Sequence, residues 1–94
     1  MIPFFYTSDG GGDQVNYDPR VIGQTIRNIR KEKGLSQDVL SGLAGIGRTH
    51  LTMIESGSKA ANMETLMKLS CAMDMKLSEL VQRYESDAEE YNEK

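Results

Sequence analysis

The sequence predicts an all-helical protein, a compact domain of five short helices, and three observations support this fold class. Apolar residues in the middle of the chain recur at intervals of three and four, the spacing that gathers them on one helix face. No stretch alternates apolar and polar residues for long enough to indicate a strand. The chain has 94 residues, of which 38% are hydrophobic, and this is enough for one core of ordinary size.

The first helix is expected from Pro19 to about Lys33. Proline suits the first turn of a helix, and Gly34 provides a stop at the other end. Four apolar residues in this stretch share one face and are expected in the core, namely Val21, Ile22, Ile26 and Ile29.

A second helix is expected to begin after Ser36, because a serine side chain can cap the backbone N–H groups left exposed at a helix start. Asp38 is favourable in the first turn, beside the positive end of the helix dipole. The buried face of this helix is expected to consist of Val39, Leu40 and Leu43.

A tight turn through Gly45 allows a third helix to begin near Gly47 and to run to Glu55. Leu51 and Ile54 are three positions apart and are expected to face inward. The opposite side then carries Arg48, Thr49, Thr52 and Met53. Two short helices joined by a glycine-containing turn, the second with a polar outer face, form the pattern of a helix-turn-helix.

The third helix is expected to end at Ser56-Gly57-Ser58, and Asn62 is a suitable cap for a fourth helix. The core of the fourth helix is expected to include Met63, Leu66, Met67, Leu69 and Met73. Cys71, between these residues, is expected to be a small buried hydrophobic side chain. Four methionines are interpreted as core filler or as the edge of an interface: Met63, Met67, Met73 and Met75. A fifth helix is expected to begin with Leu77, Leu80 and Val81.

The formal net charge of -3 is distributed unevenly along the chain. Residues 1–18 contain three acids and no base, and residues 84–94 contain five acids and one base. Residues 19–83 contain ten bases and six acids, so this part is moderately basic and compatible with a phosphate backbone as partner. We therefore divide the chain into a flexible arm and linker over 1–18, a helical domain over 19–83 and an acidic extension over 84–94.

Both ends leave alternatives open. Val81, Tyr84, Ala88 and Tyr91 recur at helical intervals, so either the fifth helix continues with a narrow apolar stripe that needs a partner, or the acidic extension is frayed. At the other end, three consecutive glycines follow an apolar arm containing Ile2, Phe4, Phe5 and Tyr6. This arm packs on its own domain, exchanges with a second subunit or stays loose.

Several classes of protein are disfavoured. No stretch approaches the roughly 18 apolar residues of a membrane span, and the first residues lack the basic flank of a secretory signal, so we expect a cytoplasmic protein with no membrane partner. One cysteine, Cys71, and one histidine, His50, provide neither a disulfide nor a zinc site. The glycines match no nucleotide-binding fingerprint. We expect no cofactor, no metal and no catalytic residue.

Four segments in order carry a resemblance: GLSQDVL at 34–40, LAGIGR at 43–48, IESG at 54–57 and METLMKL at 63–69. Together they resemble the phage-repressor and Cro type of helix-turn-helix, the XRE-like family, over about residues 20 to 81. The resemblance implies a repressor-like DNA-binding domain whose third helix lies in the major groove of double-stranded DNA.

The resemblance also implies roles for individual residues. Arg48 is expected to read a guanine through its O6 and N7 atoms, with Thr49, Thr52 and Met53 as further base-reading residues. Phosphate contacts are expected from Gln37, His50, Ser56, Ser58 and Lys59. Arg30 and Glu55 correspond to the family's internal ion pair, which has a structural role.

Two departures from the family pattern weaken the expected contact with DNA. Gly47 stands where the family often has a serine or threonine cap, and it contributes no side-chain acceptor. The segment Ser58-Lys59-Ala60-Ala61 is less basic than the usual loop. Fewer phosphate contacts predict weaker binding with a shallower salt dependence, so affinity would depend strongly on dimerisation.

The expected function is that of a sequence-specific transcriptional regulator, a repressor that binds a two-fold operator as a homodimer. Two alternatives stay open. One is the antitoxin of a toxin–antitoxin pair, which regulates its own operon and neutralises a protein partner through a terminal segment. The other is a helix-turn-helix module that binds proteins instead of DNA.

Overall fold

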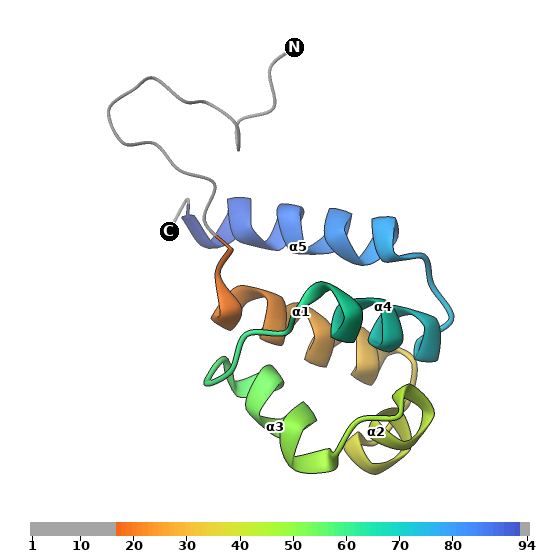
Figure 1. Cartoon of the computed structure of the whole chain (residues 1–94). Coiled ribbons are helices and arrows are strands. Elements are labelled where there is room, and N and C mark those ends of the chain that lie inside the picture. The colour runs from red at the N-terminus through yellow and green to blue at the C-terminus, as the bar shows by residue number, and fades with distance from the viewer. Residues whose placement is uncertain (1–16, 93–94) are drawn as a thin grey trace.

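The computed structural model describes residues 17–92, which form five helices and no strand (Figure 1). In chain order these helices are α1 (Pro19–Glu32), α2 (Gln37–Ala44), α3 (Arg48–Ser56), α4 (Met63–Ala72) and α5 (Leu77–Asn92). The predicted all-helical fold with five helices is confirmed. The apolar arm with Ile2, Phe4, Phe5 and Tyr6 lies outside the described residues, as do Glu93 and Lys94.

Short polar side chains cap three of the helix starts. The Ser36 hydroxyl accepts a hydrogen bond from the Val39 N–H at 3.1 Å, and Asn62 Oδ1 accepts one from the Thr65 N–H at 2.8 Å, both as predicted. Asp18 caps α1 in the same way. Such caps contribute about 1 kcal/mol each. Gly47 precedes α3 and provides no side-chain acceptor, also as predicted.

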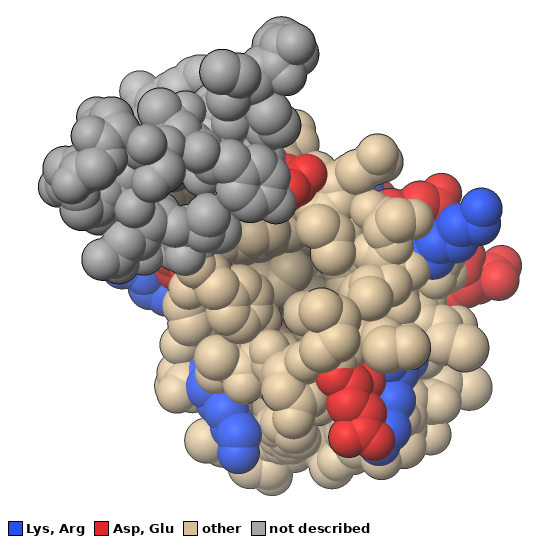
Figure 2. Space-filling model, turned by 45° about the horizontal axis from the view of Figure 1, so that its top comes forward, with Lys and Arg blue, Asp and Glu red and all other residues tan. Residues whose placement is uncertain are grey.

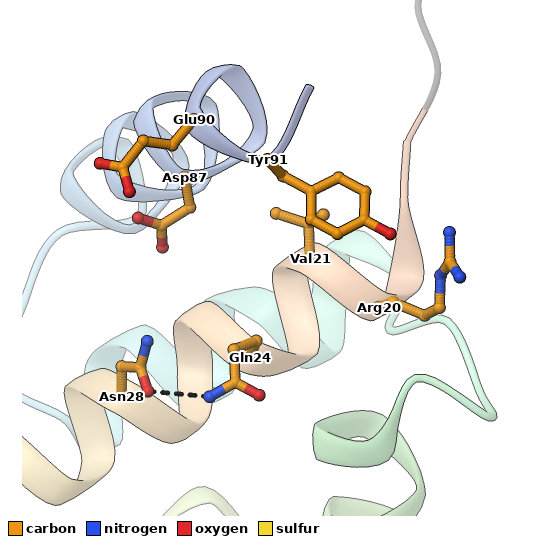
Figure 3. Close-up of a pocket in the computed structure, with 7 residues that line it drawn as sticks. All are labelled: Arg20, Val21, Gln24, Asn28, Asp87, Glu90 and Tyr91. Carbon is orange, nitrogen blue, oxygen red and sulfur yellow. Dashed lines mark hydrogen bonds between the residues drawn. The ribbon is translucent and has the colours of Figure 1, made fainter. Parts of the chain in front are cut away.

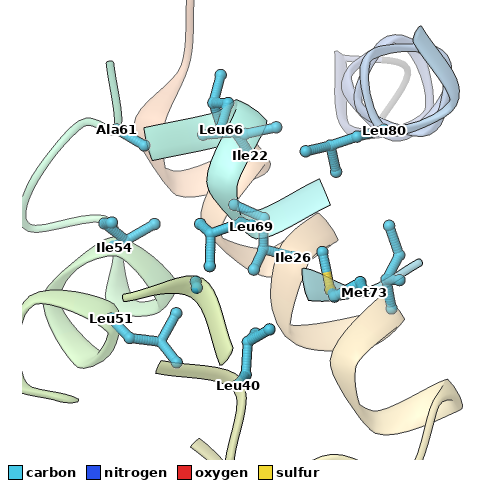
Figure 4. Packing of buried hydrophobic residues seen from close by; sticks show 12 residues of the cluster. Ile22, Ile26, Leu40, Leu51, Ile54, Ala61, Leu66, Leu69, Met73 and Leu80 are labelled. Atoms are coloured by element: carbon cyan, nitrogen blue, oxygen red, sulfur yellow. The ribbon is translucent and has the colours of Figure 1, made fainter. Parts of the chain in front are cut away.

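One apolar core joins all five helices (Figure 4). Ile26 of α1, Leu40 of α2 and Leu51 of α3 are each fully buried. Leu69 of α4 and Leu80 of α5 are buried to the same extent and close the core from the other side. The core therefore fixes how α3 is held against the remaining helices.

Five residues that we expected to be buried lie on the surface. Val39 and Leu43 are 49% and 62% exposed, because α2 turns Leu40 and Ala44 into the core instead. The remaining three belong to α4, whose inward residues are Thr65, Leu66, Leu69 and Ser70. The three that lie exposed instead are Met63, Met67 and Cys71. The core-filler interpretation is therefore wrong for Met63 and Met67, and Cys71 is not a buried residue.

The C-terminal helix continues through the acidic extension and packs against α1. Ala88 is 8% exposed and buried in this contact, and the Thr25 hydroxyl of α1 donates a hydrogen bond to Asp87 Oδ2 at 2.6 Å. Tyr84 and Ala88 of the apolar stripe are thus covered within the same chain, whereas Tyr91 near the end of α5 is 49% exposed. The helix passes through the boundary that we placed between residues 83 and 84, and up to Asn92 the extension is helical.

Two polar contacts reinforce the packing of α5. Arg83 donates hydrogen bonds from Nη1 and Nη2 to the two carboxylate oxygens of Glu32, at 3.2 and 2.8 Å. These bonds hold the pKa of Glu32 below its usual value and raise the pKa of Arg83. Near the start of α1, the Tyr84 hydroxyl accepts a hydrogen bond from the Asp18 N–H at 2.9 Å, and the Tyr17 and Tyr84 rings meet edge to face.

Burial raises the pKa of the Tyr17 hydroxyl, which donates a hydrogen bond to the Ala61 carbonyl oxygen at 2.8 Å. Tyr17 therefore connects the segment before α1 to the segment before α4.

One face of the molecule, with the α5 side turned forward, has a broad uncharged centre with acidic and basic side chains around its edge (Figure 2).

Candidate nucleic-acid interface

The turn between α2 and α3 sets the position of the exposed third helix. Gly45 adopts a left-handed backbone conformation with φ of 73°, which glycine reaches without the steric cost of a side chain. The Ile46 N–H then donates to the Ser41 carbonyl oxygen at 3.0 Å and closes the turn. Two short helices joined in this way form the helix-turn-helix that the sequence predicts.

A very close approach of α1 and α3 occurs at Gly23. A Cβ atom added there would overlap the Ile54 carbonyl oxygen and would lie 3.0 Å from the Glu55 carbonyl oxygen. Any side chain would therefore push the two helices apart. Sequence reasoning missed this residue, although a glycine inside an otherwise apolar helix face is a signal of close backbone packing.

A buried ion pair connects the same two helices. Arg30 Nε donates to Glu55 Oε2 at 2.7 Å, and Arg30 Nη2 donates to Glu55 Oε1 at 3.0 Å. The Arg30 and Glu55 side chains are 9% and 3% exposed. Arg30 Nη1 also donates to the Leu35 carbonyl oxygen at 2.8 Å, so one guanidinium joins α1, the segment before α2 and the last turn of α3.

The four residues predicted to read bases lie on the exposed side of α3. Arg48, Thr49 and Thr52 are exposed, and Met53 is 39% exposed. Arg48 Nη1 lies 3.2 Å from Asp38 Oδ1 of α2, and both side chains are largely in solvent. An exposed pair of this kind contributes at most about 1 kcal/mol, so Arg48 can leave Asp38 for a stronger partner.

The residues predicted to contact phosphates fall into two groups. Ser56, Ser58 and Lys59 lie together at the end of α3, where both serine hydroxyls reach the Met53 carbonyl oxygen, at 3.0 and 3.2 Å. His50 is half-buried on α3. Gln37 is also half-buried, and its amide makes hydrogen bonds within the protein to Glu55 and Thr52. The DNA contacts assigned to these residues stay predictions.

A separate pocket of about 450 Å³ lies between α1 and the C-terminal half of α5 (Figure 3). The Arg20 guanidinium lies 5.8 Å from the centre of the Tyr91 ring, and Gln24 donates a hydrogen bond to Asn28 along the floor. Asp87, Glu90 and Val21 complete the lining. Figure 1 places α5 and α3 on opposite sides of α1, so this pocket lies away from the exposed side of α3.

Other kinds of site are not found in the part of the chain that the structure describes. Residues 17–92 contain no group of three histidine, cysteine or acidic side chains placed to hold a metal ion. None of the helices α1 to α5 is both long and apolar enough to cross a membrane.

The glycine turn, the exposed helix α3 and the buried ion pair beneath it define a helix-turn-helix domain. The chain belongs to the helix-turn-helix family of transcriptional regulators, since the model of the family described as "Helix-turn-helix" matches residues 26–80. The predicted resemblance to the XRE-like type is confirmed. Members of this family are DNA-binding regulators, so the expectation that the chain is not an enzyme is confirmed as well.

Three similar proteins illustrate the family. The uncharacterized HTH-type transcriptional regulator y4mF of Sinorhizobium fredii is 36% identical over 61 residues, which cover 61% of this chain and 80% of that protein. The restriction-modification controller protein C.AhdI from Aeromonas hydrophila has 35% identity and a TM-score of 0.65, over 67% of this chain and 96% of that chain. SinR, a master regulator for biofilm formation solved in complex with DNA, has 34% identity and a TM-score of 0.60, over 64% of this chain and 97% of that chain.

Proposed function

We propose that this chain is a sequence-specific repressor of transcription that binds double-stranded DNA with α3 in the major groove. The exposed face of α3 carries this proposal, because Arg48, Thr49 and Thr52 project from a helix that the core, Gly23 and the Arg30–Glu55 pair hold in place. Rigid support matters because hydrogen bonds to base edges require fixed geometry. The similarity to SinR, a protein solved with DNA, supports the same function.

Arg48 is the principal base-reading residue in this proposal. Its guanidinium can donate two parallel hydrogen bonds to the O6 and N7 atoms of guanine, which discriminate by about 1 to 3 kcal/mol. Thr49, Thr52 and Met53 contact neighbouring bases. Lys59, together with Ser56, Ser58, His50 and Gln37, contacts the phosphate backbone and sets the register of the helix.

The experiment begins with selection of bound duplexes from a random pool, followed by affinity measurements on the selected operator and on random duplex. Arg48→Ala should weaken operator binding by about 5- to 150-fold. Arg27→Ala is the matched control, because it removes one exposed positive charge from α1. On random duplex the two variants should behave alike. A parent protein with no preferred duplex would contradict the proposal and favour a protein-interaction module.

The chain acts as a homodimer in this proposal, and we assign the interface to the flank of α4. Met63 and Met67 are 60% and 54% exposed and stand one helical turn apart. Two copies of this apolar stripe can cover each other about a two-fold axis, and binding of both copies to a two-fold operator requires their α3 helices to lie roughly 34 Å apart.

Sedimentation equilibrium tests the dimer. Met67→Lys should produce monomers and reduce operator affinity, because it brings two charges into an apolar contact. Gln82→Lys adds the same positive charge at an exposed residue of another helix, α5, and should leave the parent's dimerisation unchanged. If the parent sediments as a monomer at all concentrations, or if Met67→Lys dimerises as the parent does, this interface is wrong.

A further inference from the structure

The Thr52 hydroxyl is surrounded by hydrogen-bond acceptors on its protein side. Thr52 Oγ1 lies 3.2 Å from Gln37 Oε1 and 3.0 Å from the Arg48 carbonyl oxygen. Neither neighbour can donate a hydrogen, so Thr52 is the donor, and the two acceptors share its hydrogen. A hydroxyl has a single hydrogen and two lone pairs. The hydrogen of Thr52 is therefore retained inside the protein, and the lone pairs remain for an external partner.

The buried ion pair determines that Gln37 offers its oxygen to Thr52. Gln37 Nε2 lies 3.0 Å from Glu55 Oε1, and an ionised carboxylate only accepts hydrogen bonds. Turning the Gln37 amide over would place its oxygen against that carboxylate and its NH₂ group against Thr52. Arg30 holds the Glu55 carboxylate through both of its oxygens. The fixed carboxylate orients the Gln37 amide, and the Gln37 amide in turn orients the Thr52 hydroxyl.

We propose that this relay makes Thr52 a dedicated hydrogen-bond acceptor that selects a base with an exocyclic amine, adenine through N6 or cytosine through N4. This inference rests on the proposed insertion of α3 into the major groove. A threonine with a free hydroxyl bonds to either donors or acceptors on base edges, and so discriminates less. Thr49 provides the contrast, because within residues 17–92 its hydroxyl makes no hydrogen bond.

Arg48 and Thr52 then have distinct roles along α3. Arg48 donates to a guanine, and Thr52, one turn further on, accepts from an amine-bearing base. Gln37 is a positioning residue, because it acts through Thr52 and not through its own contact with a base. The half-burial of Gln37 and its two internal hydrogen bonds explain why we give it this role in addition to a phosphate contact.

The test combines a protein variant with a change in a single base. In the selected operator, each adenine is replaced in turn by purine, which lacks the N6 amine, and each cytosine by pyrimidin-2-one, which lacks the N4 amine. Binding of the parent is compared with binding of Thr52→Val, which keeps the shape and the methyl groups but has no hydroxyl. Comparison on the same duplex cancels the effect of amine removal on the DNA itself.

At one position in each half-site, removing the amine should lower the affinity of the parent for the duplex by about 2- to 12-fold, which corresponds to one neutral hydrogen bond. The same change should not lower the affinity of Thr52→Val, whereas Thr52→Ser should lose affinity as the parent does. Thr49→Val is the control and should respond to that amine as the parent does. If amine removal affects the parent and Thr52→Val equally at every position, the inference is wrong, although α3 could still bind the groove.

Gln37→Leu tests the relay itself. This change leaves the Arg48 carbonyl oxygen as the one remaining internal acceptor for the Thr52 hydroxyl, so the dependence on the amine should weaken. General loss of structure would reduce affinity for all duplexes and would not alter the response to a single amine. An undiminished response in a folded Gln37→Leu variant would contradict the positioning role. A parent that binds no duplex would overturn this inference together with the proposed function.

Discussion

Replacing Gly23 with alanine tests how closely α1 must approach α3. Gly23 lies in the interior of α1, and a Cβ atom there would overlap the Ile54 carbonyl oxygen. It would also stand 3.0 Å from the Glu55 carbonyl oxygen and 3.1 Å from the Glu55 carbonyl carbon. All three atoms belong to backbone, so no side-chain rotation can relieve the overlap and the helices must separate.

The expected loss of stability follows from two opposing effects. Inserting an extra methyl group into a packed contact costs about 1 to 3 kcal/mol, and rigid backbone atoms place Gly23→Ala at the upper end. Alanine regains about 1 kcal/mol because it favours a helix more than glycine does. The net loss is about 2 kcal/mol in the free energy of unfolding, or about 8 to 16 °C in Tm for a domain of this size.

Thermal unfolding followed by circular dichroism measures the change, and Gly42→Ala is the matched control. Gly42 lies in α2, and a Cβ atom there meets no other atom within 4 Å. Alanine at this position should raise the stability by about 0.5 to 1 kcal/mol through helix propensity alone. If Gly23→Ala were as stable as the parent, or more stable as Gly42→Ala is expected to be, the close contact between α1 and α3 would be refuted.

Three further predictions follow from the structure. Arg30→Met leaves the Glu55 carboxylate buried without its cation, and should lower the urea-unfolding free energy by about 3 to 5 kcal/mol; a loss under 1 kcal/mol would contradict a buried pair. The pKa of Glu32 is lowered in the folded protein, so its pair with Arg83 stabilises the fold fully above the ordinary carboxyl pKa of 4.5, and this stabilisation is lost as the pH falls through the lower folded pKa. The difference in Tm between the parent and Glu32→Gln should therefore vanish in acid. A Tm difference independent of pH would refute this. Cys71 is exposed, so it should react with a thiol reagent in the folded protein. For the same reason, Cys71→Ser should change the free energy of unfolding by less than about 0.5 kcal/mol. A thiol that reacts only after unfolding would contradict its exposure.

The local signals in the sequence predicted the helices well. Ser36 and Asn62 cap the helices that we assigned to them, and Pro19 begins α1. These features depend on a few neighbouring residues, so the sequence contains them directly. Leu51 and Ile54 are likewise buried as expected, because α3 has only one apolar face.

The errors arose where a helix has more apolar residues than its neighbours can cover. Val39 and Leu40 of α2 are adjacent, and spacing alone does not say which of them the other helices will bury. The same ambiguity applies to Met63, Met67 and Cys71 on α4. Packing of the whole fold decides between such residues, and that information is distributed over all five helices.

Contacts between residues far apart in the chain were also beyond prediction from the residues alone. The hydrogen bond between Thr25 and Asp87, and the pair of Glu32 with Arg83, require α5 to dock on α1 in one particular register. The link from Glu55 through Gln37 to Thr52 depends in the same way on the angle between α2 and α3. Sequence reasoning identified Gln37 and Thr52 as site residues, but not their connection.

The central claim is that Arg48 reads a guanine from a helix inserted into the major groove. The most direct measurement replaces each guanine of the selected operator in turn with 7-deazaguanine, which lacks the N7 acceptor, and compares binding of the parent and of Arg48→Ala. The account predicts one guanine in each half-site at which the parent loses several-fold in affinity and Arg48→Ala loses nothing. Equal losses for the two proteins at every guanine, or no loss for the parent at any, would contradict it.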